Sequence, residues 1–198
     1  MNLPTKITIS RIFLIPVFLV FFYVPFWGHY FFAALVFTIS ACTDFVDGYI
    51  ARHRNMVTNF GKFLDPIADK ALAAVAMVVM VDVNQLLAPY GAVAVSLIIC
   101  RELIVSAFRI VAASKGIMLA ADTLGKLKTI FTNIALPVIM LAFAFTAKQL
   151  GSLYKIYHYF FYYAGHVAFA IAFVLTIVSG AHYIAANKKV FEEKGDAD

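Results

Sequence analysis

Four aspartates stand close together in the first third of the sequence, in two pairs. Asp44 and Asp47 are three residues apart, and Asp65 and Asp69 are four residues apart. On a helix both spacings place the two carboxylates of a pair on one face. Apolar runs of membrane-crossing length surround both pairs, and acids inside such segments are costly enough to be functional suspects by default. We therefore expect two helices that each present two acids to a common site.

Carboxylates that face one another repel, and this problem disappears when cations lie between them. A ligand set made only of oxygen atoms favours a hard divalent ion such as Mg²⁺ or Mn²⁺ over zinc. Two such ions, about 3.5–4 Å apart, would clamp a phosphoryl or pyrophosphate group. Gly48, Ala51 and Gly61 lack bulk, so a flat ligand could approach the backbone beside the acids. The alternative is that both acid pairs merely end helices at the water line, but this leaves the small residues unexplained.

The acids and small residues together form a longer pattern over residues 44–69. It reads Asp-x-x-Asp-Gly-x-x-Ala-Arg, then eight residues, then Gly-x-x-x-Asp-x-x-x-Asp. At every fixed position it resembles the signature of the CDP-alcohol phosphotransferase family. The resemblance implies an integral membrane enzyme with six transmembrane helices, usually a homodimer. Such an enzyme moves a substituted phosphate from a CDP-alcohol to an acceptor hydroxyl and releases CMP.

The same resemblance assigns roles to individual residues. It implies that the four aspartates hold two divalent cations, Mg²⁺ or Mn²⁺, and that Asp69 is also the catalytic base that deprotonates the acceptor hydroxyl. We expect Thr8, near the N-terminus, to contact the donor as well. The donor-binding residues that we predict are Thr8, Asp47, Gly48, Ala51, Arg52 and Gly61.

The composition supports a membrane protein. Of 198 residues, 63% are hydrophobic and only 14% are charged, which is too apolar for an ordinary soluble domain. We predict one all-α integral membrane domain over residues 1–198. The net charge of +5 suits an anionic membrane surface or anionic substrates. Nucleic acid is not expected, because the basic residues lie between apolar spans. Cys42 and Cys100 fall within apolar runs and are expected to be free, buried thiols.

The apolar runs predict six transmembrane helices after a short surface helix over residues 2–10. An outer link at 148–158 and a tyrosine-rich edge would precede the last span. Fourteen of the sixteen Lys and Arg residues fall on one side of this topology, and only Lys148 and Lys155 fall on the other. The positive-inside rule then places both termini and all four aspartates on the cytoplasmic side of the cell membrane. The predicted spans are roughly residues 12–24, 31–51, 61–82, 90–112, 127–147 and 164–186.

A second group of residues is basic. Arg101 and Arg109 are eight residues apart and so lie near one face of the fourth predicted span. Lys126 and Lys128 stand where the fifth span begins, and a helix N-terminus favours an anion. Guanidinium groups suit bidentate phosphate contacts. We predict that these four residues hold a phosphorylated acceptor beside the aspartates. The alternative is that they reach the lipid headgroups or pair with Glu102.

Three shorter segments point to one branch of the family. They are the opening NLPTKITISR, CRELIVSAFR at 100–109 and GKLKT at 125–129. They resemble segments of the members that use CDP-diacylglycerol as donor and sn-glycerol 3-phosphate as acceptor, although Thr5 replaces the usual Asn. The expected partners are therefore these two substrates, membrane lipids and a second copy of the chain.

Other readings stay open at this point. An inositol phosphate, serine, or phosphatidylglycerol in cardiolipin synthesis could be the acceptor instead, although the basic group argues against serine. A divalent-cation transporter is the alternative from another class of protein. A transporter would leave the glycines and Arg52 unexplained.

Overall fold

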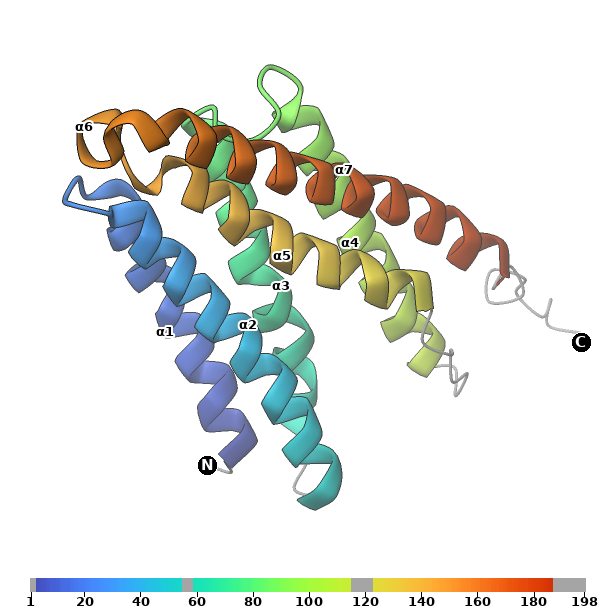
Figure 1. Cartoon of the computed structure of the whole chain (residues 1–198). Helices are drawn as coiled ribbons and strands as arrows, with labels where there is room; N and C mark the ends of the chain where they lie inside the picture. The colour runs from blue at the N-terminus through green and yellow to red at the C-terminus, as the bar shows by residue number, and fades with distance from the viewer. Residues whose placement is uncertain (1–2, 55–58, 115–122, 187–198) are drawn as a thin grey trace, which may run out of the picture.

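The computed structural model describes residues 3–54, 59–114 and 123–186 of the chain (Figure 1). These residues form seven α-helices and one short 3₁₀ helix, and no strand occurs among them. The all-α prediction is therefore confirmed for the described part of the chain. Within the helices, the side chains that the structure does not describe are those of residues 3–9, 44–54, 59–69, 111, 113, 114, 184 and 186.

The helices follow one another with short connections. Their bounds are α1 Leu3–Tyr23, α2 His29–Arg54, α3 Asn59–Asp82, α4 Gly91–Ser114, α5 Thr123–Ala144, α6 Ala147–Leu150, the 3₁₀ helix η1 Gly151–Leu153, and α7 Tyr154–Ala186.

In the described part of the chain, three helical segments are long and apolar enough to cross a membrane. They are Gly91–Ile110, Thr123–Ala144 and Ala147–Tyr183, and shorter apolar helices cover Ser10–Tyr23 and His29–Thr43. Length and hydropathy together are those of an integral membrane protein.

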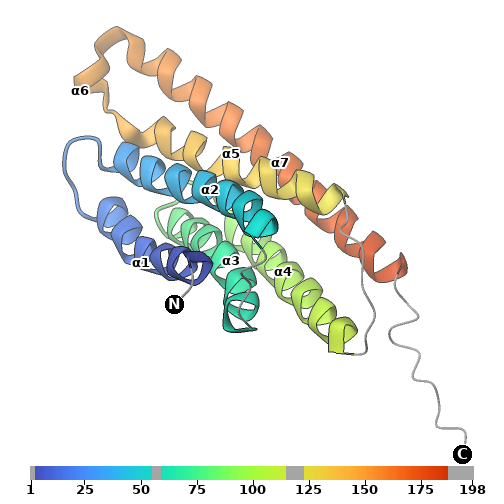
Figure 2. The same ribbon diagram turned by 90° about the horizontal axis from the view of Figure 1, so that it is seen from below.

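Long helices that follow one another in the chain run in opposite directions (Figures 1 and 2). The longest packing contact joins α5 to α7, while α1 packs on α2 and α3, α2 on α5, and α4 on α7 and α3. As a result, the starts of α1, α3 and α5 lie at the same end of the molecule as the ends of α2, α4 and α7 (Figures 1 and 2). This end contains the helix segments that carry the aspartate pattern.

The core is formed by apolar side chains from α1, α2, α3, α4, α5 and α7 and from the turn after α3. At the contact between α5 and α7, a Cβ atom on Gly165 would lie 2.5 Å from Ile139 Cγ1, so glycine lets the two helices approach closely. A smaller cluster of Val105, Phe108, Ala112 and Tyr183 joins α4 to α7. The largest fully buried apolar side chains are Phe18, Phe22, Phe37, Phe169, Met80, Leu86, Leu136, Ile139 and Met140.

The beginning of the chain differs from the prediction. We expected a separate surface helix over residues 2–10 before the first span, but α1 is one continuous helix from Leu3 to Tyr23. Between Pro4, in the first turn, and Pro16 there is neither proline nor glycine to end a helix. Once nucleated, a helix extends through such a segment because each added residue gains a hydrogen bond.

The connection before the last helix also differs. We expected a link at 148–158 and a span starting near residue 164, but α7 already begins at Tyr154. The break in the chain occurs at Gly151, whose φ of +56° favours glycine. From Tyr154 to the next glycine, Gly165, no residue interrupts a helix, so the tyrosine-rich segment is helical.

The two cysteines are free, as predicted, but both are exposed on the surface of the chain. The expectation that they are buried is therefore wrong. An apolar run predicts the membrane interior, but in a membrane helix the outward face is apolar too. The run alone does not tell which residues face the core.

Candidate functional site

The backbone places the two acid pairs on neighbouring helices. Asp44 and Asp47 belong to α2, and Asp65 and Asp69 belong to α3. Their side chains lie outside the described residues, as do those of Thr8, Gly48, Ala51, Arg52 and Gly61. Among the side chains that the structure does describe, no three His, Cys, Asp or Glu residues are grouped closely enough to hold a metal ion. The metal, donor and catalytic roles of these residues stay predictions.

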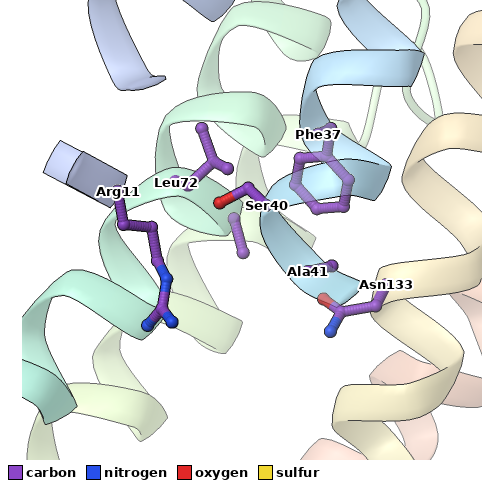
Figure 3. Close-up of a pocket in the computed structure, with 7 residues that line it drawn as sticks. Arg11, Phe37, Ser40, Ala41, Leu72 and Asn133 are labelled. Atoms are coloured by element: carbon purple, nitrogen blue, oxygen red, sulfur yellow. The ribbon is translucent and has the colours of Figure 1, made fainter. Parts of the chain in front are cut away.

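A small pocket lies between α1, α2, α3 and α5, beside the helix segments that carry the acids. Its volume is about 30 Å³, enough for a water molecule or a small polar group. Figure 3 shows Arg11, Ser40 and Asn133 reaching it from three different helices. Arg11 is only 6% exposed, and the hydroxyl of the fully buried Ser40 has no hydrogen-bond partner among the residues that the structure describes. The lining residues are Arg11, Phe37, Ser40, Ala41, Leu72, Ala73 and Asn133.

Helical spacing relates this pocket to the acids. Asp44 follows Ser40 by four residues, and Asp69 precedes Ala73 by four residues. Residues four apart share a helix face, so the faces of α2 and α3 that line the pocket are the faces on which we expect the acids. The polar pocket therefore lies one helical turn away from the predicted metal site, further inside the helix bundle.

Helix α5 presents side chains both to this pocket and to a different surface, which faces α4. Asn133 lines the pocket, and Lys126, seven residues earlier, lies near the same face by spacing. Lys128 lies on another face, which is turned toward α4. The two lysines were predicted to act together, but they lie on different faces of α5.

Glu102 on α4 is the centre of a group of four charged side chains. Lys70 Nζ on α3 lies 3.3 Å from its Oε2, and Arg101 Nη1 lies 3.2 Å from its Oε1. Lys128 Nζ on α5 also contacts Oε1. The group is shielded from solvent to different degrees, with 7% of the Lys128 side chain, 13% of Arg101, 19% of Glu102 and 40% of Lys70 exposed. Among the described side chains, the group therefore joins three basic residues and one carboxylate.

Two serines and a glycine hold this group in place. Ser106 accepts a hydrogen bond from Lys70 Nζ and donates to the Glu102 carbonyl oxygen at 2.6 Å. Ser179 on α7 accepts a hydrogen bond from Arg101 Nη2 at 2.9 Å. A Cβ atom on Gly180 would lie 3.0 Å from Arg101 Cγ, so glycine leaves room for the arginine stem. Arg101 is thus fixed by contacts from two helices.

Arg109 lies apart from this group. Its Nε donates to Tyr183 Oη at 3.2 Å, and its guanidinium carbon lies 5.4 Å from the centre of the Tyr183 ring. It follows Arg101 by eight residues, or about 12 Å along the helix. Among the described contacts, the structure therefore brings Arg101 and Lys128 together around Glu102, but not Arg109 or Lys126.

Several polar residues that line the pocket or surround Glu102 were not predicted as site residues. Lys70 could have been found, because it directly follows Asp69 in the acid pattern. Arg11, Ser40 and Asn133 are polar residues in apolar runs, and Ser40 stands one turn before Asp44. Sequence alone could not show that these three line the same pocket, because they come from different helices.

Comparison with known proteins assigns the chain to a family. The sequence model described as CDP-alcohol phosphatidyltransferase matches residues 1–178. The chain belongs to this family, which confirms the resemblance drawn from the aspartate pattern.

Similar proteins of known name cover nearly the whole chain. A CDP-diacylglycerol--glycerol-3-phosphate 3-phosphatidyltransferase of Bacillus subtilis is 39% identical over 201 residues, covering 94% of this chain and 95% of that protein. Proteins with the same name from Rickettsia bellii and Escherichia coli K12 are 36% and 35% identical. They cover 96% and 94% of this chain, and 97% and 95% of their own length.

Proposed function

We propose that this chain transfers the phosphatidyl group of CDP-diacylglycerol to sn-glycerol 3-phosphate, forming phosphatidylglycerophosphate and releasing CMP. The observation that carries the proposal is the complete aspartate signature in a chain that matches phosphatidyltransferases of this name over 94% of its length. The reaction would be a step of phospholipid biosynthesis.

The donor would bind between α2 and α3. Four carboxylates from two helices are a suitable ligand set for two Mg²⁺ or Mn²⁺ ions. Such ions would offset the charge of the donor pyrophosphate and of the leaving CMP. Gly48, Ala51 and Gly61 would leave room for the cytidine, and Arg52 is suited to a phosphate contact. Thr8 lies three residues before the pocket-lining Arg11, which supports a place for it near the donor.

The acceptor would be held by the positive group around Glu102. Lys70 belongs to this group and is the residue after Asp69, the predicted base. An acceptor phosphate bound there would lie beside the base that takes the hydroxyl proton. A positively charged site favours glycerol 3-phosphate over serine, which carries no phosphate.

We also propose the membrane setting of the enzyme. Six spans would place both termini and the active site on the cytoplasmic side of the cell membrane. This is supported by the charge distribution and by the position of the α1 start and the α7 end at the same end of the molecule (Figure 1). The acyl chains of the donor could then stay in the lipid while its headgroup reaches the site. A homodimer is proposed from the family resemblance.

An assay of CMP release tests the proposal. Purified protein in detergent receives CDP-diacylglycerol with glycerol 3-phosphate, an inositol phosphate, serine or phosphatidylglycerol. We expect CMP release with glycerol 3-phosphate only. Preference for another acceptor would assign the chain to another activity of the same family. No release with any acceptor, together with divalent-cation flux into proteoliposomes, would support the transporter instead.

The same assay tests the metal requirement. A chelator should abolish CMP release, and added Mg²⁺ or Mn²⁺ should restore it, because the predicted donor site is built from carboxylates. Full activity in metal-free protein would contradict the two-ion site.

A further inference from the structure

We propose that Ser40 of α2 and Asn133 of α5 bind an ester carbonyl oxygen of the CDP-diacylglycerol donor, and that they thereby select an ester-linked lipid. The binding place is the small pocket between α1, α2, α3 and α5. The inference rests on the proposed function and adds to it two residues that recognise the lipid part of the donor.

The first argument is the uncommitted hydroxyl of Ser40. This residue is 1% exposed, and its hydroxyl has no hydrogen-bond partner in the described part of the chain. Two nearby hydroxyls on α2 behave differently, because Thr38 donates to the Ala34 carbonyl and Thr43 donates to the Ile39 carbonyl, each at 2.8 Å. A buried hydroxyl without a partner costs free energy, so we expect this one to bind a ligand.

The second argument is the size and chemistry of the pocket. Its volume is about 30 Å³, enough for a water molecule or a single carbonyl group but not for a phosphate with its substituents. The Ser40 hydroxyl and the Asn133 amide are both hydrogen-bond donors, and in so small a pocket both can reach one oxygen atom. Apart from Arg11, the other lining residues are apolar. A carbonyl oxygen suits such a place, because it accepts hydrogen bonds and carries no charge to desolvate.

The third argument is the position of the pocket relative to the predicted metal site. Ser40 precedes Asp44 by four residues, which is about 6 Å along the helix, and it lies further inside the bundle. In the donor, only a few bonds through the glycerol backbone separate the phosphate from the nearer ester carbonyl. A donor whose pyrophosphate is held at the acids would therefore bring this carbonyl to the level of the pocket.

The fourth argument is that the acyl chain can stay in lipid. Asn133 is half-buried, whereas Ser40 is buried, so the pocket has a partly exposed rim on the side of α5. Next to this rim, Ile130 and Ile134 of α5 are 53% and 51% exposed, as expected for side chains that face lipid. A carbonyl group at the rim can therefore enter the pocket while its chain lies on this apolar surface.

The test compares CDP-diacylglycerol with an ether-linked CDP-dialkylglycerol, which lacks the ester carbonyls. The unmodified enzyme should use the ether donor with a kcat/KM at least about fivefold lower, because buried hydrogen-bond donors then stay without a partner. Ser40→Ala and Asn133→Ala should each lower kcat/KM for the ester donor about two- to tenfold. Neither variant should change kcat/KM for the ether donor appreciably, so the ester-to-ether ratio should approach one in the double variant.

Thr38→Ala is the matched control. It removes a hydroxyl from the same helix, but this hydroxyl already donates to the Ala34 carbonyl. The ester-to-ether ratio should stay that of the unmodified enzyme. Thermal unfolding in detergent is a second measurement, which needs no turnover. The ester donor should raise the Tm of the unmodified protein more than the ether donor does, and this difference should shrink in Ser40→Ala and in Asn133→Ala.

Three results would overturn the inference. Equal kcat/KM values for the two donors in the unmodified enzyme would show that the carbonyl is not recognised, and would leave the pocket to a bound water. An ester-to-ether ratio that persists in both variants would place the recognition elsewhere. Equal losses for the two donors in both variants would show a role in packing only. An unmodified protein that releases no CMP with glycerol 3-phosphate would instead contradict the proposed function, and the unfolding comparison of the two donors would still test the inference.

Discussion

Helices α5 and α7 pack along each other through two regions of different chemistry. In the first region, neutral side chains bond to backbone: Tyr157 Oη donates to the Leu141 carbonyl at 2.5 Å, and His158 Nδ1 donates to the Ala142 carbonyl at 2.8 Å. We call this region the aromatic half, because rings pack around these bonds. The ring pairs are Phe143–His158, Phe143–Tyr162, Tyr154–His158, Tyr157–Phe161 and Tyr162–His166.

In the second region, which we call the charged half, the side chains near the same two helices are ionic. Lys128 of α5 pairs with Glu102, and Ser179 of α7 bonds to Arg101. Lys70 completes the group from α3.

The aromatic half and the charged half are expected to serve stability and function, respectively. In the aromatic half, each of the two neutral hydrogen bonds is completed within the chain and holds α7 against α5. In the charged half, three basic side chains meet one described carboxylate. Ionisable side chains inside a membrane protein are costly for stability and are typical of a functional site. We therefore expect substitutions in the aromatic half to change stability, and substitutions in the charged half to change catalysis.

The largest expected effect comes from the acid site next to the charged half. Asp69→Asn removes the predicted base, and positioned base catalysis is worth about 10²–10⁴-fold in rate. CMP release at saturating substrates should fall by about that factor, while thermal unfolding in detergent stays unchanged. Asp82→Asn, on the same helix, should keep full turnover. Near-normal turnover in Asp69→Asn would contradict its role as base and as metal ligand.

A matched pair of glycine substitutions in α7 compares the two halves directly. In Gly165→Ala the new Cβ meets Ile139 Cγ1 at 2.5 Å and the Ile139 backbone nitrogen at 3.0 Å. Such overpacking should lower the free energy of unfolding by about 1–3 kcal/mol, with both KM values unchanged.

In Gly180→Ala the nearest atoms belong to the Arg101 side chain and not to backbone, beginning with Cγ at 3.0 Å. Stability should change less, while the KM for glycerol 3-phosphate should rise by up to roughly tenfold, which corresponds to about 1.4 kcal/mol. Thermal unfolding and steady-state kinetics of both variants give the comparison. The opposite pattern, with loss of acceptor affinity in Gly165→Ala only, would contradict the division into two halves.

The smallest expected effect concerns one hydrogen bond of the aromatic half. Tyr157→Phe removes the bond to the Leu141 carbonyl and keeps the ring that packs against Phe161. The free energy of unfolding should fall by about 0.5–1.5 kcal/mol. The measurement is again thermal unfolding, with Tyr159→Phe on the exposed side of α7 as the control. A change in acceptor KM in Tyr157→Phe would show that the aromatic half takes part in catalysis.

Much about this protein was predictable from the sequence, because it depends on local geometry. The period of a helix relates Asp44 to Asp47 and Asp65 to Asp69 without knowledge of any other segment. The apolar runs likewise predict membrane helices, since a helix satisfies its own backbone hydrogen bonds in lipid. The pattern over residues 44–69 therefore led to the family that the comparisons confirmed.

The partners of the charges required the tertiary structure. Arg101, Arg109, Lys126 and Lys128 were predicted from the sequence to form one group, because all are basic residues on the same predicted side of the membrane. The orientation of α4 and α5 about their own axes places Arg101 and Lys128 against Glu102 and Arg109 against Tyr183. Lys126 lies on another face of α5. Lys70 joins the group only because α3 packs on α4. Which charges meet depends on packing between helices, and helical periodicity along one segment cannot determine that packing.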